Sequence, residues 1–213
     1  MILLFIYQCL IYFILNSIWN PHSFRAISIL TCNGYTLNQE TNIGTVLFVI
    51  SGYIVALMYY LKRVNHAFSM YDYIAVRKTN QTNYFSKFIL KRSILWICQI
   101  LLVRILIDII TCVYTFLYYG DQIIITDILS DLLRYGLIIL LFTMLILICN
   151  LCGFNGKYII VMLVLLLGIS MLTHFDQAKN TIFCITTILI LIPITLFLMR
   201  DYEGIKRRDD YHD

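Results

Sequence analysis

Residues 62–92 read KRVNHAFSMYDYIAVRKTNQTNYFSKFILKR, and this stretch decides how the chain is organised. It holds seven of the sixteen Lys and Arg residues of the chain, whereas long apolar runs precede and follow it. Lys and Arg in short connections between apolar runs set the orientation of a membrane protein, with the basic side facing inward. The stretch therefore predicts a cytoplasmic connection between two membrane spans.

The composition of the whole chain agrees with a membrane protein. Of its 213 residues, 61% are hydrophobic and 13% are charged. A soluble domain carries about 25% charged residues, roughly twice that share. The apolar runs approach the length of about twenty residues that a helix needs to cross a bilayer. We therefore expect the chain to be built from membrane-spanning helices.

Six apolar runs predict an all-α, polytopic membrane domain over residues 1–199, followed by a cytoplasmic tail at 200–213. The expected spans lie at about residues 2–19, 45–61, 93–119, 132–150, 158–173 and 181–199. Six spans place both termini on one side, and the segments of that side hold twelve Lys and Arg residues against three on the other side. We therefore expect a multi-pass protein of the cell membrane with both termini in the cytoplasm (N-in, C-in).

The first half of the central stretch predicts a short cytoplasmic helix of its own. Ser69 and Asp72 have the S-x-x-D spacing of a capping box, so the helix should start near Met70. Arg77 and Lys78 should close it, because cations suit the C-terminal end of a helix. The alternative is a connection that only sets orientation, for which a few charges would suffice.

The second half of the stretch predicts another helix. Polar residues 79–83 should break the first helix, and the second should begin at Tyr84. The helix should have two faces. Phe85, Phe88 and Ile89 form the apolar face, and Lys87 and Lys91 form the basic face. This helix should lie along the membrane surface or continue directly into the third span.

The order of residues here is Tyr73-Ile-Ala-Val-Arg77, then Tyr84-Phe85, then Lys87 and Arg92 at the start of a span. This pattern resembles the loop between the second and third spans in permease subunits of type-2 (ABC-2-like) ABC transporters. The six-span layout and the chain length also fit that family. Most similar are the small permeases of bacteriocin, lantibiotic or antimicrobial-peptide export and immunity systems in Gram-positive bacteria.

The resemblance implies a coupling helix that sits in a groove of a separate ATP-binding subunit and passes on its closure. The coupling residues would be Tyr71, Asp72, Tyr73, Ile74, Arg77 and Lys78. The resemblance also implies a dimer, with a second copy or a sister permease, and export of a peptide-like substrate. The chain differs from the family between the fifth and sixth spans, where the outer segment is reduced to residues 174–180.

A charged pair interrupts the third apolar run. Arg104 and Asp108 are four residues apart, so they lie on one face of a helix. Charges inside a membrane are energetically costly and are usually paired. The pair is either a polar element of a translocation path or subunit interface, or a self-neutralising pair that lets a long helix pack. A third possibility is a displaced helix that brings Asp108 near the outer surface.

Tyrosines near the ends of the apolar runs are interpreted as anchors in the membrane interface, where the amphipathic ring is favoured. Tyr53, Tyr59 and Tyr60 belong to this set.

No pattern in the sequence predicts catalysis, a cofactor or a metal. The chain lacks a G-x-x-x-x-G-K-[ST] motif, so ATP hydrolysis is expected on a separate subunit. The four His residues lie in four separate segments without ligand spacing. Cys149 and Cys152 form one C-x-x-C without a second pair, which favours structural cysteines. Nucleic-acid binding is not expected, because orientation accounts for basic residues beside spans.

A different class of function fits the same composition. The chain could be a non-transporting membrane immunity or accessory protein that binds a toxin or another membrane protein. In that case the outer loop at residues 20–44 should matter for protection, and Arg77 should not.

Overall fold

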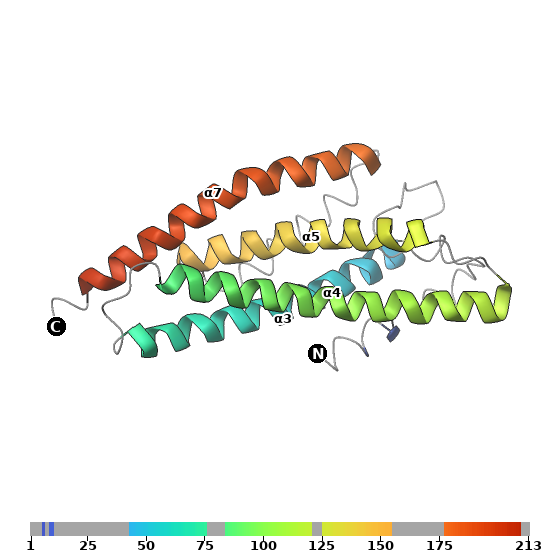
Figure 1. Cartoon of the computed structure of the whole chain (residues 1–213), viewed down its shortest axis with the longest axis horizontal. Coiled ribbons are helices and arrows are strands. Elements are labelled where there is room, and N and C mark those ends of the chain that lie inside the picture. Colours follow the sequence, from blue (N-terminus) through green and yellow to red (C-terminus); the bar gives the residue numbers. More distant parts are fainter. Residues whose placement is uncertain are drawn as a thin grey trace.

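The computed structural model describes residues 43–75, 84–120, 125–154 and 177–209, together with residues 6, 9 and 10. Its long elements are α3 (Ile43–Ala75), α4 (Tyr84–Tyr119), α5 (Ile125–Leu151) and α7 (Gln177–Asp209) (Figure 1). The expected all-α fold is thus confirmed for the described part of the chain. The expected fifth span, at residues 158–173, lies outside the described residues, as does most of the first.

Within the described part of the chain, three helical segments are long and apolar enough to cross a bilayer: Phe85–Tyr114, Leu132–Leu151 and Ile182–Tyr202. Their outward faces carry large exposed apolar side chains, such as Leu102 on α4 and Phe197 on α7. Apolar surface on this scale is unusual on a soluble protein and suits contact with lipid. These features identify a membrane protein, and the segments overlap the expected third, fourth and sixth spans.

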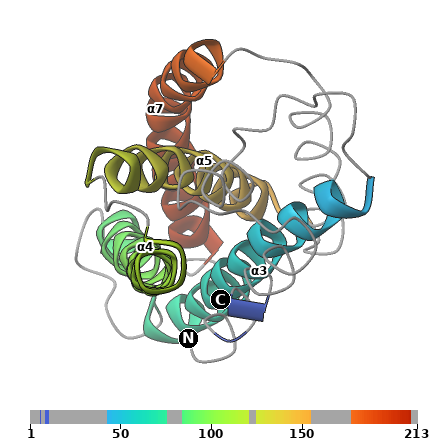
Figure 2. The same cartoon turned by 90° about the vertical axis from the view of Figure 1, so that its right-hand side faces the viewer.

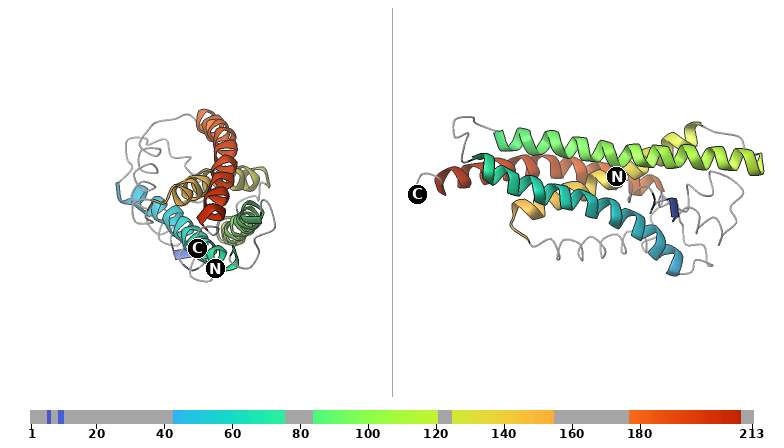
Figure 3. Two further views of the ribbon diagram at one scale, coloured as in Figure 1. Left: turned by 90° about the vertical axis from the view of Figure 1, so that its left-hand side faces the viewer. Right: turned by 90° about the horizontal axis from the view of Figure 1, so that it is seen from below.

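The four helices form one elongated bundle. α5 lies against α3, α4 and α7 (Figure 2). α3, α5 and α7 end at the same end of the bundle, where α4 begins (Figures 1 and 3). We call this the basic end, because five exposed cations lie on α3 and α4 toward it: Lys62, Arg63, Lys87, Lys91 and Arg92. Pro193 lies inside α7, which bends along its length (Figure 1).

α3 corrects one prediction. It is a single helix that passes through Lys62 and Arg63, where the sequence predicts the end of a span. The Ser69 hydroxyl donates a hydrogen bond to the carbonyl oxygen of His66 at 3.0 Å, so Ser69 lies inside the helix and does not cap one. The predicted separate helix starting near Met70 is therefore wrong.

The cause of this continuity is burial. Beyond the apolar run, α3 keeps apolar residues at intervals of three and four, and these are buried: Leu61, Val64, Ala67 and Tyr71. A stripe with this spacing forms one helical face that packs on a neighbour. The tertiary contact therefore extends α3 through a segment whose local signals favour a break.

The predicted start of α4 is confirmed. α4 begins at Tyr84 and continues without interruption into the apolar run. The two expected faces are also present. On the apolar face, Phe85 and Ile89 are buried and Phe88 is half-buried. On the basic face, Lys87 and Lys91 are exposed.

Two glycines end α4 and α5. Gly120 has φ 65° and its N–H donates to the carbonyl of Phe116 at 3.1 Å. Gly153 has φ 76°, its N–H donates to the carbonyl of Asn150, and the Phe154 N–H donates to Cys149. This pair of bonds is a Schellman cap, which needs a left-handed residue and so favours glycine.

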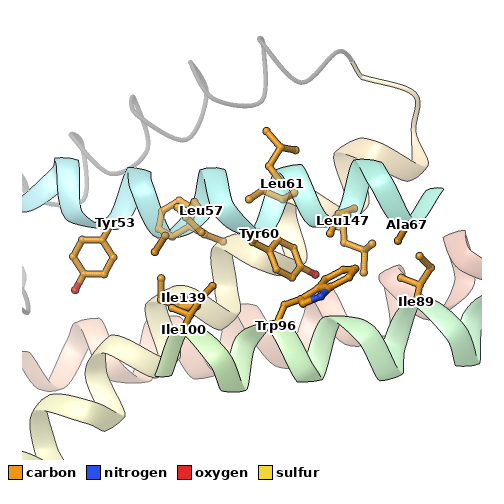
Figure 4. Packing of buried hydrophobic residues seen from close by; sticks show 14 of the residues in the cluster. Tyr53, Leu57, Tyr60, Leu61, Ala67, Ile89, Trp96, Ile100, Ile139 and Leu147 are labelled. Atoms are coloured by element: carbon orange, nitrogen blue, oxygen red, sulfur yellow. The ribbon is translucent and has the colours of Figure 1, made fainter. Parts of the chain in front are cut away.

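The core lies where α3, α4 and α5 meet. Figure 4 shows Tyr60 and Trp96 reaching toward each other from α3 and α4, with ring centroids 6.0 Å apart. The Tyr60 hydroxyl donates to Ser93 Oγ at 3.0 Å. Tyr53 and Tyr60 are only 2% and 1% exposed, so their interpretation as interfacial anchors is wrong. Both side chains are on the inward face of α3. They are buried because of that face, although they lie near the ends of an apolar run.

Candidate functional site

The predicted charged pair forms inside α4. Arg104 Nε and Asp108 Oδ1 are 3.1 Å apart, and the two side chains are 4% and 0% exposed. Both residues share the inward face of α4 with the buried Val103, Ile107 and Thr111. The predicted placement of the pair on one helical face is confirmed.

Arg104 lies deep within the candidate span Phe85–Tyr114. At about 1.5 Å per residue, it is about 18 Å along α4 from Arg92 and about 15 Å from Tyr114. At this depth neither charge is stabilised by bulk water. Each therefore depends on its partner, and loss of one partner leaves an uncompensated charge in a low-dielectric interior.

Two tyrosines from other helices extend the charged pair into a cluster. The guanidinium carbon of Arg104 lies 5.0 Å from the ring centroid of Tyr135 on α5. The Tyr135 ring is 5.2 Å from that of Tyr53 on α3. A cation over an aromatic ring is attracted to its negative face. The cation on α4 is thus joined to α5 directly and to α3 through a second ring.

The sequence alone did not identify Tyr135 as a partner of Arg104. A usable signal was present, because Tyr135, Ile139, Phe142 and Ile146 recur at intervals of three and four and are all buried. This spacing marks the inward face of α5. It does not reveal that Arg104 lies opposite, since that depends on how α4 and α5 pack.

A second cluster of side chains lies at the basic end. Four aromatic rings come together there: Phe68 and Tyr71 of α3, Phe85 of α4 and Tyr202 of α7. Their ring centroids are 4.4 Å apart for Tyr71 and Phe85, 5.3 Å for Phe68 and Phe85, 4.9 Å for Phe85 and Tyr202, and 5.5 Å for Phe68 and Tyr202. We call this group the ring cluster. It joins α3 and α4, which are neighbours in the sequence, to α7, which is distant from both.

The predicted coupling residues lie beside the ring cluster. Tyr71 is buried against Phe85, so it supports the segment from within. Asp72, Tyr73 and Ile74 belong to the last turn of α3. Arg77 and Lys78 lie outside the described residues. The role of these six residues in coupling stays a prediction.

Two of the exposed cations at the basic end, Arg63 and Arg92, each lie over an aromatic ring of their own helix. The Arg63 guanidinium lies 5.4 Å from the Tyr59 ring centroid, and the Arg92 guanidinium lies 4.7 Å from that of Phe88. Each pair is four residues apart on its own helix, so the stem of the arginine lies along an aromatic neighbour while the charge stays at the surface. These arginines suit a boundary between an apolar and an aqueous phase.

No protein-family model, no curated protein and no solved structure matches this chain. The function is therefore inferred from its residues and their geometry. Within residues 43–75, 84–120, 125–154 and 177–209, no group of three or more His, Cys, Asp or Glu residues could hold a metal ion. Cys149 and Cys152 are free thiols, the first half-buried and the second exposed.

Proposed function

We propose that this chain is the membrane-spanning permease subunit of a type-2 ABC exporter. A separate ATP-binding subunit hydrolyses ATP, the permease acts as a dimer with itself or a sister chain, and the substrate is a peptide. One observation carries the proposal. The end of α3 and the start of α4 are held together by Tyr71, a predicted coupling residue, and Phe85, whose ring centroids are 4.4 Å apart.

The directions of the helices support six spans with both termini in the cytoplasm. α3, α4 and α5 alternate in direction, as consecutive spans do (Figure 1). α5 and α7 run in the same direction, which requires an odd number of crossings between them if both cross the membrane. The predicted fifth span, at residues 158–173, supplies that crossing. The basic end then faces the cytoplasm by the positive-inside rule.

The proposed mechanism is mechanical. Closure of the ATP-binding subunit pushes on the segment between α3 and α4. Because both helices continue from that segment into the bundle, a displacement there tilts them as rigid rods. The contact of Arg104 with the Tyr135 ring ties α4 to α5 within the membrane, so α5 moves with α4.

Purification of the complex from native membranes tests this proposal. The tagged chain is extracted in a mild detergent, and the co-purifying proteins are identified. We expect an ATP-binding subunit in fixed ratio to the permease. Arg77→Ala combined with Tyr73→Ala should release that subunit, whereas Arg134→Ala, near the opposite end of the bundle, should retain it.

Two results would count against the proposal. One is a complex without any ATP-binding protein. The other is a chain that protects its host from a toxin regardless of the Arg77→Ala change, which would favour the non-transporting immunity protein.

A further inference from the structure

At the basic end, α3 continues past the end of its apolar run and meets the charged ends of α4 and α7. α3 extends from Lys62 to Ala75, about 20 Å at about 1.5 Å per residue. The charged start of α4, residues 84–92, adds about 13 Å, and residues 200–209 of α7 add about 15 Å. We call these three segments the three-helix stalk. Figure 3 shows them converging at one end of the bundle.

The three-helix stalk has a packed interior. Val64 and Ala67 of α3, Phe85 and Ile89 of α4 and Met199 of α7 are at most 1% exposed. Phe85 also belongs to the ring cluster, whose aromatic pairs join all three helices. Aromatic pairs in these geometries stabilise a contact beyond the area they bury. The stalk is therefore a rigid body built from three helices, with α7 as one of its sides.

The charge of the three-helix stalk is strongly one-signed. Together with the connection at residues 76–83, its segments hold eleven of the sixteen Lys and Arg residues and four of the twelve Asp and Glu residues of the chain. The remainder of the chain is net acidic. Orientation in the membrane needs only a few cations near the span ends. Among the described side chains of the stalk segments, six cations and one acid are exposed: Lys62, Arg63, Lys87, Lys91, Arg92, Arg200 and Asp201.

We propose that the three-helix stalk is one docking surface for the acidic face of a protein partner, and that α7 is an essential side of it. Tyr202 is the positioning residue, because its ring holds α7 against Phe68 and Phe85. The proposal goes beyond coupling at residues 71–78, since it adds a third helix to the surface. It does not depend on the partner being an ATPase.

The length of the stalk favours a protein over an anionic lipid surface. The headgroup layer on one side of a bilayer is about 5–7 Å thick, the difference between a core of about 30 Å and a whole bilayer of about 40–45 Å, divided by two. α3 alone continues about 20 Å past the end of its apolar run. Most of the α3 part of the stalk therefore stands beyond the headgroups, where a protein with an acidic face can contact it.

Photo-crosslinking in the native host tests the docking surface. Benzoyl-phenylalanine replaces one residue at a time, at Met70 of α3, Lys87 of α4 or Asp201 of α7. All three side chains are exposed. Leu102, exposed on the outward face of α4 in mid-span, is the matched control. We expect one protein to be captured from all three stalk positions and not from Leu102, with the crosslinked fragments mapping to an acidic face.

Two further variants test charge and geometry. Lys91→Glu should reduce capture from Met70 at least fivefold, and Lys91→Arg should leave it unchanged. Tyr202→Ala should reduce capture from Asp201 at least fivefold and spare capture from Lys87, whereas Tyr202→Phe should retain both. The elution profile of each purified variant in detergent shows whether that variant is folded. If a variant is misfolded, the crosslinks from the parent chain still test the docking surface.

Several outcomes would overturn the inference. They are crosslinks to lipid alone, different proteins at the three positions, a silent position on α7, or capture unaffected by Lys91→Glu. An acidic partner without ATP-binding activity would support the docking surface and contradict the proposed permease function. An ATP-binding partner captured from α3 and α4 but never from α7 would support the proposed permease function and contradict the three-helix docking surface.

Discussion

Asp108→Asn is the substitution that most sharply tests the buried charge cluster. The change keeps the size and shape of the side chain but removes the negative charge 3.1 Å from Arg104 Nε. Because both side chains are at most 4% exposed, the remaining guanidinium has no access to bulk water. The Tyr135 ring lies over the cation at 5.0 Å in the parent and is unchanged by the substitution, so it does not replace the lost charge.

The expected magnitude follows from this geometry. Removing one partner of a buried ion pair costs about 3–5 kcal/mol, and an arginine in mid-span costs about 2.5–3.5 kcal/mol on insertion scales. The face of a tyrosine stabilises a desolvated cation by about 1–2 kcal/mol. Because this contact is present in both the parent and the variant, it cancels in the difference between them. We therefore expect Asp108→Asn to lower the free energy of unfolding by about 3 kcal/mol, roughly a hundredfold in the folding equilibrium.

The assay is reversible unfolding in bicelles, followed by steric trapping, for the parent and four variants: Asp108→Asn, Arg104→Met, Asp108→Leu and the double variant Arg104→Met/Asp108→Leu. Arg104→Met combined with Asp108→Leu removes both charges and should fall within about 1 kcal/mol of the parent, because a buried pair replaced by apolar groups is close to neutral. The reasoning is refuted if Asp108→Asn stays within about 1 kcal/mol of the parent. It is refuted equally if the double variant loses as much stability as Arg104→Met and Asp108→Leu do in sum.

Three further predictions concern stability and use the same unfolding measurement. Gly153→Ala should destabilise the fold by about 1 kcal/mol, because φ 76° strains a residue with a Cβ. Gly136→Ala should stabilise it by up to about 1 kcal/mol, because alanine favours a helix interior and the new Cβ would meet Leu101 at an ordinary 3.5 Å. Tyr60→Phe should lose about 0.6 kcal/mol with its hydrogen bond to Ser93, and the loss should vanish in a Ser93→Ala background. Phe85→Ala should lose about 3–5 kcal/mol, and Leu90→Ala, exposed on the same helix, well under half of that.

Local pattern was sufficient to predict several features of this fold. Apolar runs predicted the helical class, and the spacing of four residues predicted the Arg104–Asp108 pair. The start of α4 at Tyr84 followed from a polar break and a two-faced helix. In each case the determining interaction lies within one helical turn or one run, so sequence neighbours carry the information.

Features that depend on packing between helices could not be predicted. The S-x-x-D spacing at Ser69 indicated a helix start, but burial of Val64 and Ala67 keeps α3 continuous. The ring pair of Phe85 and Tyr202 joins residues more than a hundred positions apart, and no periodicity within α4 or α7 reveals it. The contact of Arg104 with Tyr135 likewise requires knowledge of which faces of α4 and α5 meet.

The most direct test of the account is the side of the membrane on which the basic end lies. Single cysteines replace Met70, Lys87 or Asp201, or Gly120 at the opposite end, in a background in which all seven native cysteines are replaced by alanine. Reaction with a membrane-impermeant maleimide-polymer is read as a gel shift. The account predicts that the three stalk cysteines react only after permeabilisation and that the Gly120→Cys chain reacts in intact cells. Reaction of any stalk cysteine in intact cells, or stalk cysteines on different sides, would contradict it.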